Sequence, residues 1–180
     1  MTRIIDLSLP HQNFASEPYS PVITHTTHDE GARRLATLAK IDPTDFEGGM
    51  ALASDEVTAS THAGTHVDAP WHYGPTCEGK PSKTIDQVPL EWCYGNGVVL
   101  DFRYLEQGSE ITVEDVKKAL EMIHYTLKEG DIVLIETGAD KYWGTTKYLP
   151  AQSGLGMAAT EFIVDQGVKV IGIDGWGVDR

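Results

Sequence analysis

The spacing of hydrophobic and polar positions changes along the chain and predicts where its elements lie. In the C-terminal half, three short apolar runs of the buried-strand type occur at residues 97–102, 132–135 and 168–173. Two stretches between them, 112–127 and 156–166, place apolar side chains every three to four positions, as amphipathic helices do. This alternation of strands and helices predicts an α/β layer with parallel pairing.

The N-terminal third has a pattern that favours extended segments. Residues 4–9 alternate apolar and polar side chains before a proline, as expected of a strand that ends in a loop. Residues 31–40 show helical spacing and should end at an Asp-Pro pair. Across residues 57–67, β-branched side chains on both sides of Gly64 predict two extended segments joined by a turn. No linker or repeat interrupts the chain, so we expect one domain over residues 1–180.

Composition and charge narrow the classes of function. The 180 residues are 41% hydrophobic and 23% charged, which suits a globular domain whose core needs no disulfide. Cys77 and Cys93 have no CxxC spacing and are expected to be free thiols. Because 27 acidic residues against 14 basic ones give a net charge of −13, we expect no nucleic-acid or membrane partner. No stretch resembles a secretory signal or membrane helix, so the expected compartment is the cytoplasm.

Candidate chemistry concentrates in residues 62–72, which contain three of the seven histidines and an aspartate. Imidazole nitrogens and a carboxylate oxygen are ligands that catalytic zinc prefers, usually with one coordination position left open. Residues two apart in an extended chain share a face, so His66 and Asp68 should point the same way. The glycine between the two histidines permits a bend that brings His62 to the same point. These three residues are the predicted metal ligands.

His72 has a different expected role. Pro70 should end the extended segment and set His72 apart from the ligand row, which leaves its imidazole available for proton transfer. Trp71 flanks the site and either lines an aromatic pocket or is an ordinary core or surface residue. Histidines at short spacing also occur by chance, and no helical geometry forces these to converge. A purely structural use of the histidines is therefore the alternative.

The string HAGTHVDAPWH at residues 62–72 resembles the H-x-G-T-H-x-D-A-P-x-H signature of the cyclase family of metal-dependent hydrolases. This family includes bacterial kynurenine formamidase, isatin hydrolase and trans-dienelactone hydrolase. Three further segments resemble family motifs: IIDLSLP at 4–10, GDIVLIETGADKYWG at 130–144 and GVKVIGIDGWGVD at 167–179. The resemblance therefore covers most of the chain.

The resemblance implies a swivelling β/β/α domain with a mixed sheet that forms homodimers or homotetramers. It matches His62, His66 and Asp68 to the metal ligands and His72 to the catalytic histidine. The implied cofactor is a divalent metal, zinc first and manganese as the alternative. Many members hold a second metal through a histidine and a glutamate nearer the C-terminus. Because no histidine follows His124 here, we expect a C-terminally short or incomplete version of the family domain.

The activity implied by the resemblance is hydrolysis of an amide or lactone bond in a small molecule, most like an arylformamidase that converts N-formylkynurenine to kynurenine and formate. Metal-bound hydroxide would attack the carbonyl, and His72 would pass a proton to the leaving nitrogen. Asp174 and Asp179 are expected to support the site or bond the backbone. The open alternatives are an isatin or dienelactone hydrolase, a catalytically silent metal-binding module, and an interaction subunit with structural histidines.

Overall fold

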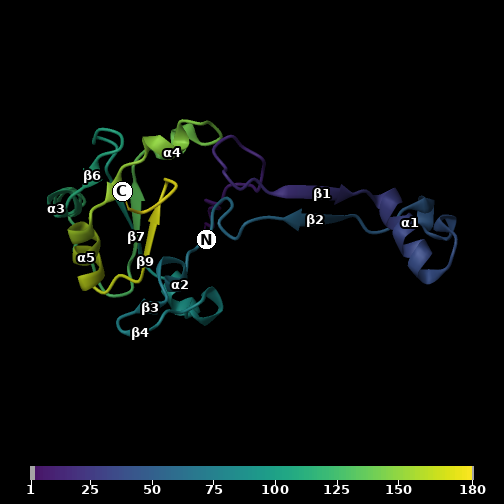
Figure 1. Cartoon of the computed structure of the whole chain (residues 1–180), viewed down its shortest axis with the longest axis horizontal. Helices are drawn as coiled ribbons and strands as arrows, with labels where there is room; N and C mark the ends of the chain where they lie inside the picture. The colour runs from purple at the N-terminus through teal and green to yellow at the C-terminus, as the bar shows by residue number, and fades with distance from the viewer. Residues whose placement is uncertain (1–2, 180) are drawn as a thin grey trace. The chain divides into compact units, whose positions relative to one another are not determined.

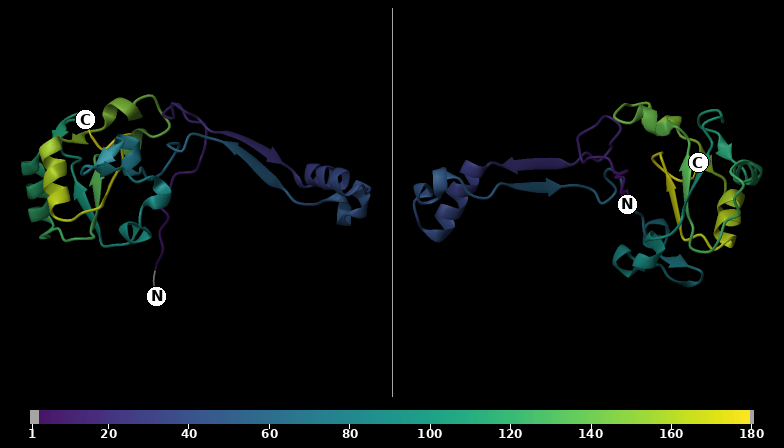
Figure 2. Two further views of the ribbon diagram at one scale, coloured as in Figure 1. Left: turned by 60° about the horizontal axis from the view of Figure 1, so that its bottom comes forward. Right: turned by 180° about the vertical axis from the view of Figure 1, so that it is seen from behind.

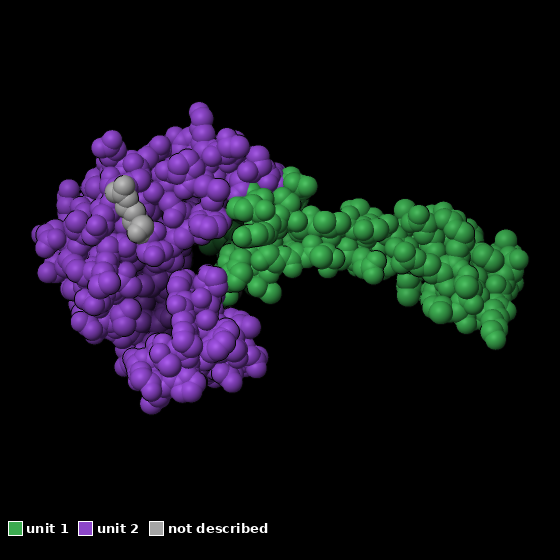
Figure 3. Space-filling model, viewed as in Figure 1, with its two compact units in different colours: residues 1–13, 17–67 green, residues 14–16, 68–180 purple. Residues whose placement is uncertain are grey.

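The computed structural model describes residues 3–179, which divide into two compact units (Figure 3). Unit 1 comprises residues 1–13 and 17–67, and unit 2 comprises residues 14–16 and 68–180. Each unit is a region within which contacts concentrate, which is a different property from folding as an independent domain. The expectation of one domain over the whole chain therefore stays a prediction.

Unit 1 is built around a two-stranded antiparallel ribbon. Strand β1 (Val22–Thr26) pairs along its whole length with β2 (Ser54–Thr58). Helix α1 (His28–Ala39) follows β1 beyond one end of the ribbon (Figure 1). Two single-turn 3-10 helices, Pro43–Asp45 and Glu47–Gly49, lie on the return path to β2. Every side chain of β2 is exposed, so the ribbon buries little apolar surface of its own.

Two expected extended segments of the N-terminal third differ from the structure. Residues 4–9 form no strand, because no described segment pairs with their backbone in a ladder, and alternation of side chains cannot replace that pairing. Of residues 57–67, only the first two lie in β2, and the others form a loop. The chain turns at Gly64, whose φ is +63°, so the predicted turn is confirmed and the second strand is wrong.

Helix α1 begins three residues earlier than predicted. The carboxylate of Glu30 accepts a hydrogen bond from the backbone N–H of Thr27 at 2.8 Å, which satisfies a donor just before the helix. This arrangement extends the helix back to His28. At its other end Lys40 adopts a left-handed conformation, with φ +56°, and Pro43 follows three residues later. The predicted end is therefore confirmed.

Unit 2 contains the predicted parallel sheet. Its strands β5 (Gly97–Asp101), β7 (Ile132–Glu136) and β9 (Val170–Ile173) lie side by side in that order, and both pairs are parallel. Helices α3 (Val113–Met122) and α5 (Met157–Asp165) connect them and lie next to each other on one face of the sheet (Figure 2). Both connections, β5–α3–β7 and β7–α5–β9, step in the same direction across the sheet. Because crossovers between parallel strands are right-handed, both helices lie on the same face. The α/β class, with both parallel and antiparallel pairing in the chain, is confirmed.

The main core lies between this sheet and its two helices. Alternate residues of β5 and β7 point toward the helices, whereas Val99 on the other face of β5 is 49% exposed. The largest apolar side chains of the core, each no more than 2% exposed, are Leu100, Phe102, Ile111, Val116, Val133, Ile135, Leu155 and Ile163. The predicted strands and helices of the C-terminal half thus share one apolar cluster.

Shorter elements complete unit 2. They are the one-turn helix α2 (Pro70–Tyr73), the hairpin of β3 (Thr76–Cys77) and β4 (Lys80–Pro81), the 3-10 helices Ile85–Gln87, Leu90–Cys93 and Ala139–Tyr142, the parallel pair β6 (Glu110–Ile111) and β8 (Gly154–Leu155), and α4 (Tyr148–Ala151). Cys77 and Cys93 are free and exposed, as predicted. Within residues 3–179, no helix combines the length and the apolar character that crossing a bilayer requires.

The N-terminus of α3 offers a test of local stability. The Thr112 hydroxyl accepts from the Asp115 N–H at 3.2 Å, and the Asp115 carboxylate accepts from the Thr112 N–H at 3.0 Å. Because Thr112→Ala removes one half of this capping box, we expect the free energy of unfolding to fall by about 1 kcal/mol in urea denaturation. Thr146→Ala, at an exposed position outside the helices, is the control. Equal losses in the two variants would contradict the capping role.

Candidate metal centre

The loop that presents His62 is held by hydrogen bonds to its backbone. The His62 N–H donates to the Ser60 hydroxyl at 3.2 Å, and the Gly64 N–H donates to the Glu17 carboxylate at 3.1 Å. Gly64 has a positive φ, and a Cβ at this position would lie 2.9 Å from a ring carbon of His11. Glycine is therefore required here for two reasons, backbone conformation and space.

The orientation of His66 fixes which of its ring nitrogens carries a proton. Its Nδ1 lies 2.8 Å from the carbonyl oxygen of Gly64. A carbonyl oxygen only accepts, so Nδ1 is the donor in this bond. Histidines that bind metals commonly make such a second bond to a carbonyl. The His66 ring lies 5.2 Å from the His62 ring, at an interplanar angle of 86°.

The short helix α2 places His72. Pro70 occupies its first turn, where a backbone N–H is not needed, and the His72 N–H donates to the Ala69 carbonyl at 2.9 Å. The Trp71 N–H donates to the Lys83 carbonyl at 3.0 Å, which anchors α2 to the segment after β4. Pro70 thus starts a helical turn, which brings residue 72 back toward residue 68.

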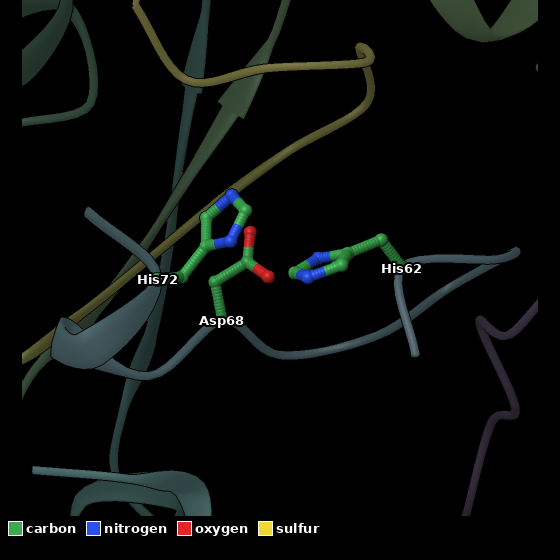
Figure 4. Close-up of side chains that lie close together, drawn as sticks. All are labelled: His62, Asp68 and His72. Carbon is green, nitrogen blue, oxygen red and sulfur yellow. The ribbon is translucent and has the colours of Figure 1, made fainter. Parts of the chain in front are cut away.

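The side chains of His62, Asp68 and His72 point toward one another (Figure 4). Each offers one ligand atom, and the three atoms lie within 4.8 Å of one another. Ligand atoms of a tetrahedral zinc site lie roughly 3.4 Å apart, given bonds of about 2.1 Å, so small side-chain rotations would bring these three to such a spacing. Two imidazoles and a carboxylate fit zinc or manganese by donor type.

The structure brings together three of the four predicted site residues. His66 is the one outside this group, although it was predicted as a ligand, and His72 is inside it, although it was predicted to act beside the metal. Residues 66–69 form no strand, so the shared face expected for His66 and Asp68 does not arise from strand geometry. The ligand role of His66 and the proton-transfer role of His72 both stay predictions.

Tyr73 is a neighbour of this group that the sequence pattern does not identify. Its hydroxyl donates to Oδ2 of Asp68 at 3.4 Å, and its ring lies 5.1 Å from the His72 ring. No spacing rule identifies this tyrosine, because its contact with Asp68 depends on the single helical turn of α2.

Asp174 bonds the loop at the carboxyl end of β7. Its Oδ1 accepts from the Thr137 N–H at 2.9 Å and from the Thr137 hydroxyl at 2.7 Å, and its Oδ2 accepts from the Gly138 N–H at 2.6 Å. Asp179 forms a β-bridge with Leu155. The expectation that Asp174 satisfies the backbone is confirmed.

Fold and site together define an α/β protein with a candidate metal centre of histidine and aspartate side chains. A family model named Cyclase, described as "Putative cyclase", matches residues 5–180. The chain belongs to this cyclase family.

Solved structures share the fold. Isatin hydrolase A from Ralstonia solanacearum is 19% identical, with a TM-score of 0.75, and the match covers 99% of this chain and 68% of that one. A protein described as a novel cyclase is 22% identical, with a TM-score of 0.72 and coverage of 98% and 67%. A protein described as a potential metal-dependent hydrolase with cyclase activity is 21% identical, with a TM-score of 0.62 and coverage of 98% and 69%. The chain thus spans about two thirds of the length of each.

Proposed function

We propose that the protein is a metal-dependent hydrolase of amide or lactone bonds. The observation that carries this proposal is the convergence of His62, Asp68 and His72 to within 4.8 Å in a chain of the cyclase family. The description of one structural neighbour as a potential metal-dependent hydrolase supports it. When bound, a divalent cation supplies a Lewis acid that polarises a carbonyl and lowers the pKa of water.

The proposed ligands are His62, His66 and Asp68. The Nδ1 of His66 donates to a carbonyl, a bond that histidines which bind metals commonly make. Asp68 is half-buried, which limits competition from water for its oxygens. His72 is exposed on α2 and can accept a proton from water and return it to a leaving nitrogen or oxygen. In this division one imidazole stays outside the coordination sphere for proton transfer.

The proposed substrate is a small arylformamide such as N-formylkynurenine. Trp71 and Tyr73 flank His72 and are 55% and 68% exposed, so their rings offer apolar surface to an aromatic amine. Isatin is the second candidate, favoured by the structural likeness to isatin hydrolase A. Because isatin is a cyclic amide on an aromatic ring, both candidates require attack on a carbonyl beside an aryl nitrogen.

We also propose that the protein acts as a homodimer or homotetramer. The two strands of the ribbon in unit 1 each have an outer edge without a strand partner among the described residues, and the side chains of β2 are exposed. An isolated two-stranded ribbon is marginally stable in water. Pairing with a second copy would cover these edges.

A substrate panel tests the function directly. Protein loaded with Zn²⁺ or Mn²⁺, with its metal content verified by elemental analysis, is assayed on N-formylkynurenine, isatin and a dienelactone. We expect turnover of at least one of them, its loss on chelation and its recovery when metal is restored. Stoichiometric metal without turnover of any substrate would contradict the hydrolase and favour a silent metal-binding module. Failure to bind metal at all would favour structural histidines.

A further inference from the structure

We propose that Tyr73 is a positioning residue that holds Asp68 in the orientation that binds a cation and packs against His72 beside it. This inference rests on the proposed metal-binding function of the same segment. It adds a supporting side chain outside the ligand set.

The position of the Tyr73 hydroxyl is determined by the local backbone. Tyr73 is the last residue of α2, and the Gly74 N–H donates to the Pro70 carbonyl at 3.3 Å to close that turn. The bond from the Trp71 N–H to the Lys83 carbonyl ties the same turn to a second segment. The phenol therefore reaches Asp68 from a turn that is held at both ends.

Tyr73 contacts two of the three grouped side chains by two different interactions. Its hydroxyl donates to Oδ2 of Asp68 at 3.4 Å. Its ring meets the His72 ring at a centroid distance of 5.1 Å and an interplanar angle of 79°, an edge-to-face arrangement. Because this hydrogen bond limits rotation of the Asp68 carboxylate, the second oxygen of that carboxylate points in a narrower range of directions. Carboxylates that bind metals are commonly held by outer hydrogen bonds of this kind.

Tyr73 and Asp68 are complementary as donor and acceptor, because a phenol hydroxyl can donate and a carboxylate oxygen accepts. Because the side chain is 68% exposed, its removal should open no cavity in the core.

The test is Tyr73→Phe in the full chain, a change that keeps the ring on His72 and deletes only the donor to Asp68. Zn²⁺ affinity is measured by titration against a competing chelator, and folding by melting temperature without metal. We expect affinity to fall about 10-fold, the lower end of the range for losing such a partner, with the melting temperature unchanged. Tyr94→Phe, at a side chain that is 89% exposed, is the matched control and should bind as the parent does.

The outcomes separate this inference from the function on which it rests. Parent protein that binds Zn²⁺ no better than Tyr73→Phe overturns the positioning role, whereas a parent that binds no Zn²⁺ contradicts the proposed function itself. If Tyr73→Phe also melts at a lower temperature, the two affinities are compared where circular dichroism shows both proteins fully folded. A loss of affinity there supports the proposal, and equal affinity overturns it.

Discussion

Replacing His72 by alanine should lower kcat by about 10²- to 10⁴-fold, the usual contribution of a general acid or base, and leave the bound metal in place. Asp68→Ala and His66→Ala should lose both metal and turnover, because each removes a proposed ligand. The reason for the difference is that His66 makes the Nδ1 bond to a carbonyl that is typical of metal-binding histidines, whereas His72 is assigned to proton transfer. Metal content by elemental analysis and kcat on the best substrate of the panel measure the two effects.

The arrangement of the side chains makes this experiment decisive between two ligand sets. His72 lies with His62 and Asp68 within 4.8 Å, and His66 lies outside that group. If His72→Ala loses metal and His66→Ala keeps it, then His72 is the ligand and the ligand role of His66 is wrong. His25→Ala is the control, since His25 is an exposed imidazole on β1 that pairs with Asp55 at 2.7 Å. It should change neither metal content nor kcat.

Replacing Asp174 by alanine should lower the free energy of unfolding by about 3 kcal/mol. Its carboxylate accepts three hydrogen bonds of 2.6 to 2.9 Å from Thr137 and Gly138, and bonds to a charged group each contribute about 1.5 to 3 kcal/mol. The sum is discounted because the donors of half-buried Thr137 regain some bonding to water. Asp174→Asn keeps one carbonyl oxygen and should lose less. Urea denaturation at constant pH measures all variants.

The control for this prediction is Asp165→Ala, at an exposed carboxylate on the last turn of α5. It should change stability by no more than about 0.5 kcal/mol. A loss below 1 kcal/mol in Asp174→Ala would mean that the loop after β7 does not depend on this carboxylate. The loss is large against a total stability of about 5 to 15 kcal/mol for a typical domain.

Local pattern was a good guide where an element buries its own face. The apolar run at residues 97–102 became β5, and the helical spacing after Thr112 became α3, because the buried side chains of both elements meet the same core. The helix ends at Met122 and not at the predicted residue 127. Pattern was a poor guide at residues 4–9, where the alternation is present but residues 3–179 supply no partner strand. A strand requires a second chain segment to pair with, and the alternation of one segment does not specify it.

Sequence alone determined the α/β class, the parallel order of strands and helices in the C-terminal half, the turn at Gly64 and the string of residues 62–72 in which the site lies. These follow from periodicity, from the backbone freedom of glycine and from the identity of side chains, all of which are local properties. Only the tertiary structure decided that His62, Asp68 and His72 converge, that the His66 ring turns to the Gly64 carbonyl and that a tyrosine reaches Asp68. Convergence depends on the φ and ψ angles of a loop and one helical turn, which spacing along the chain does not specify.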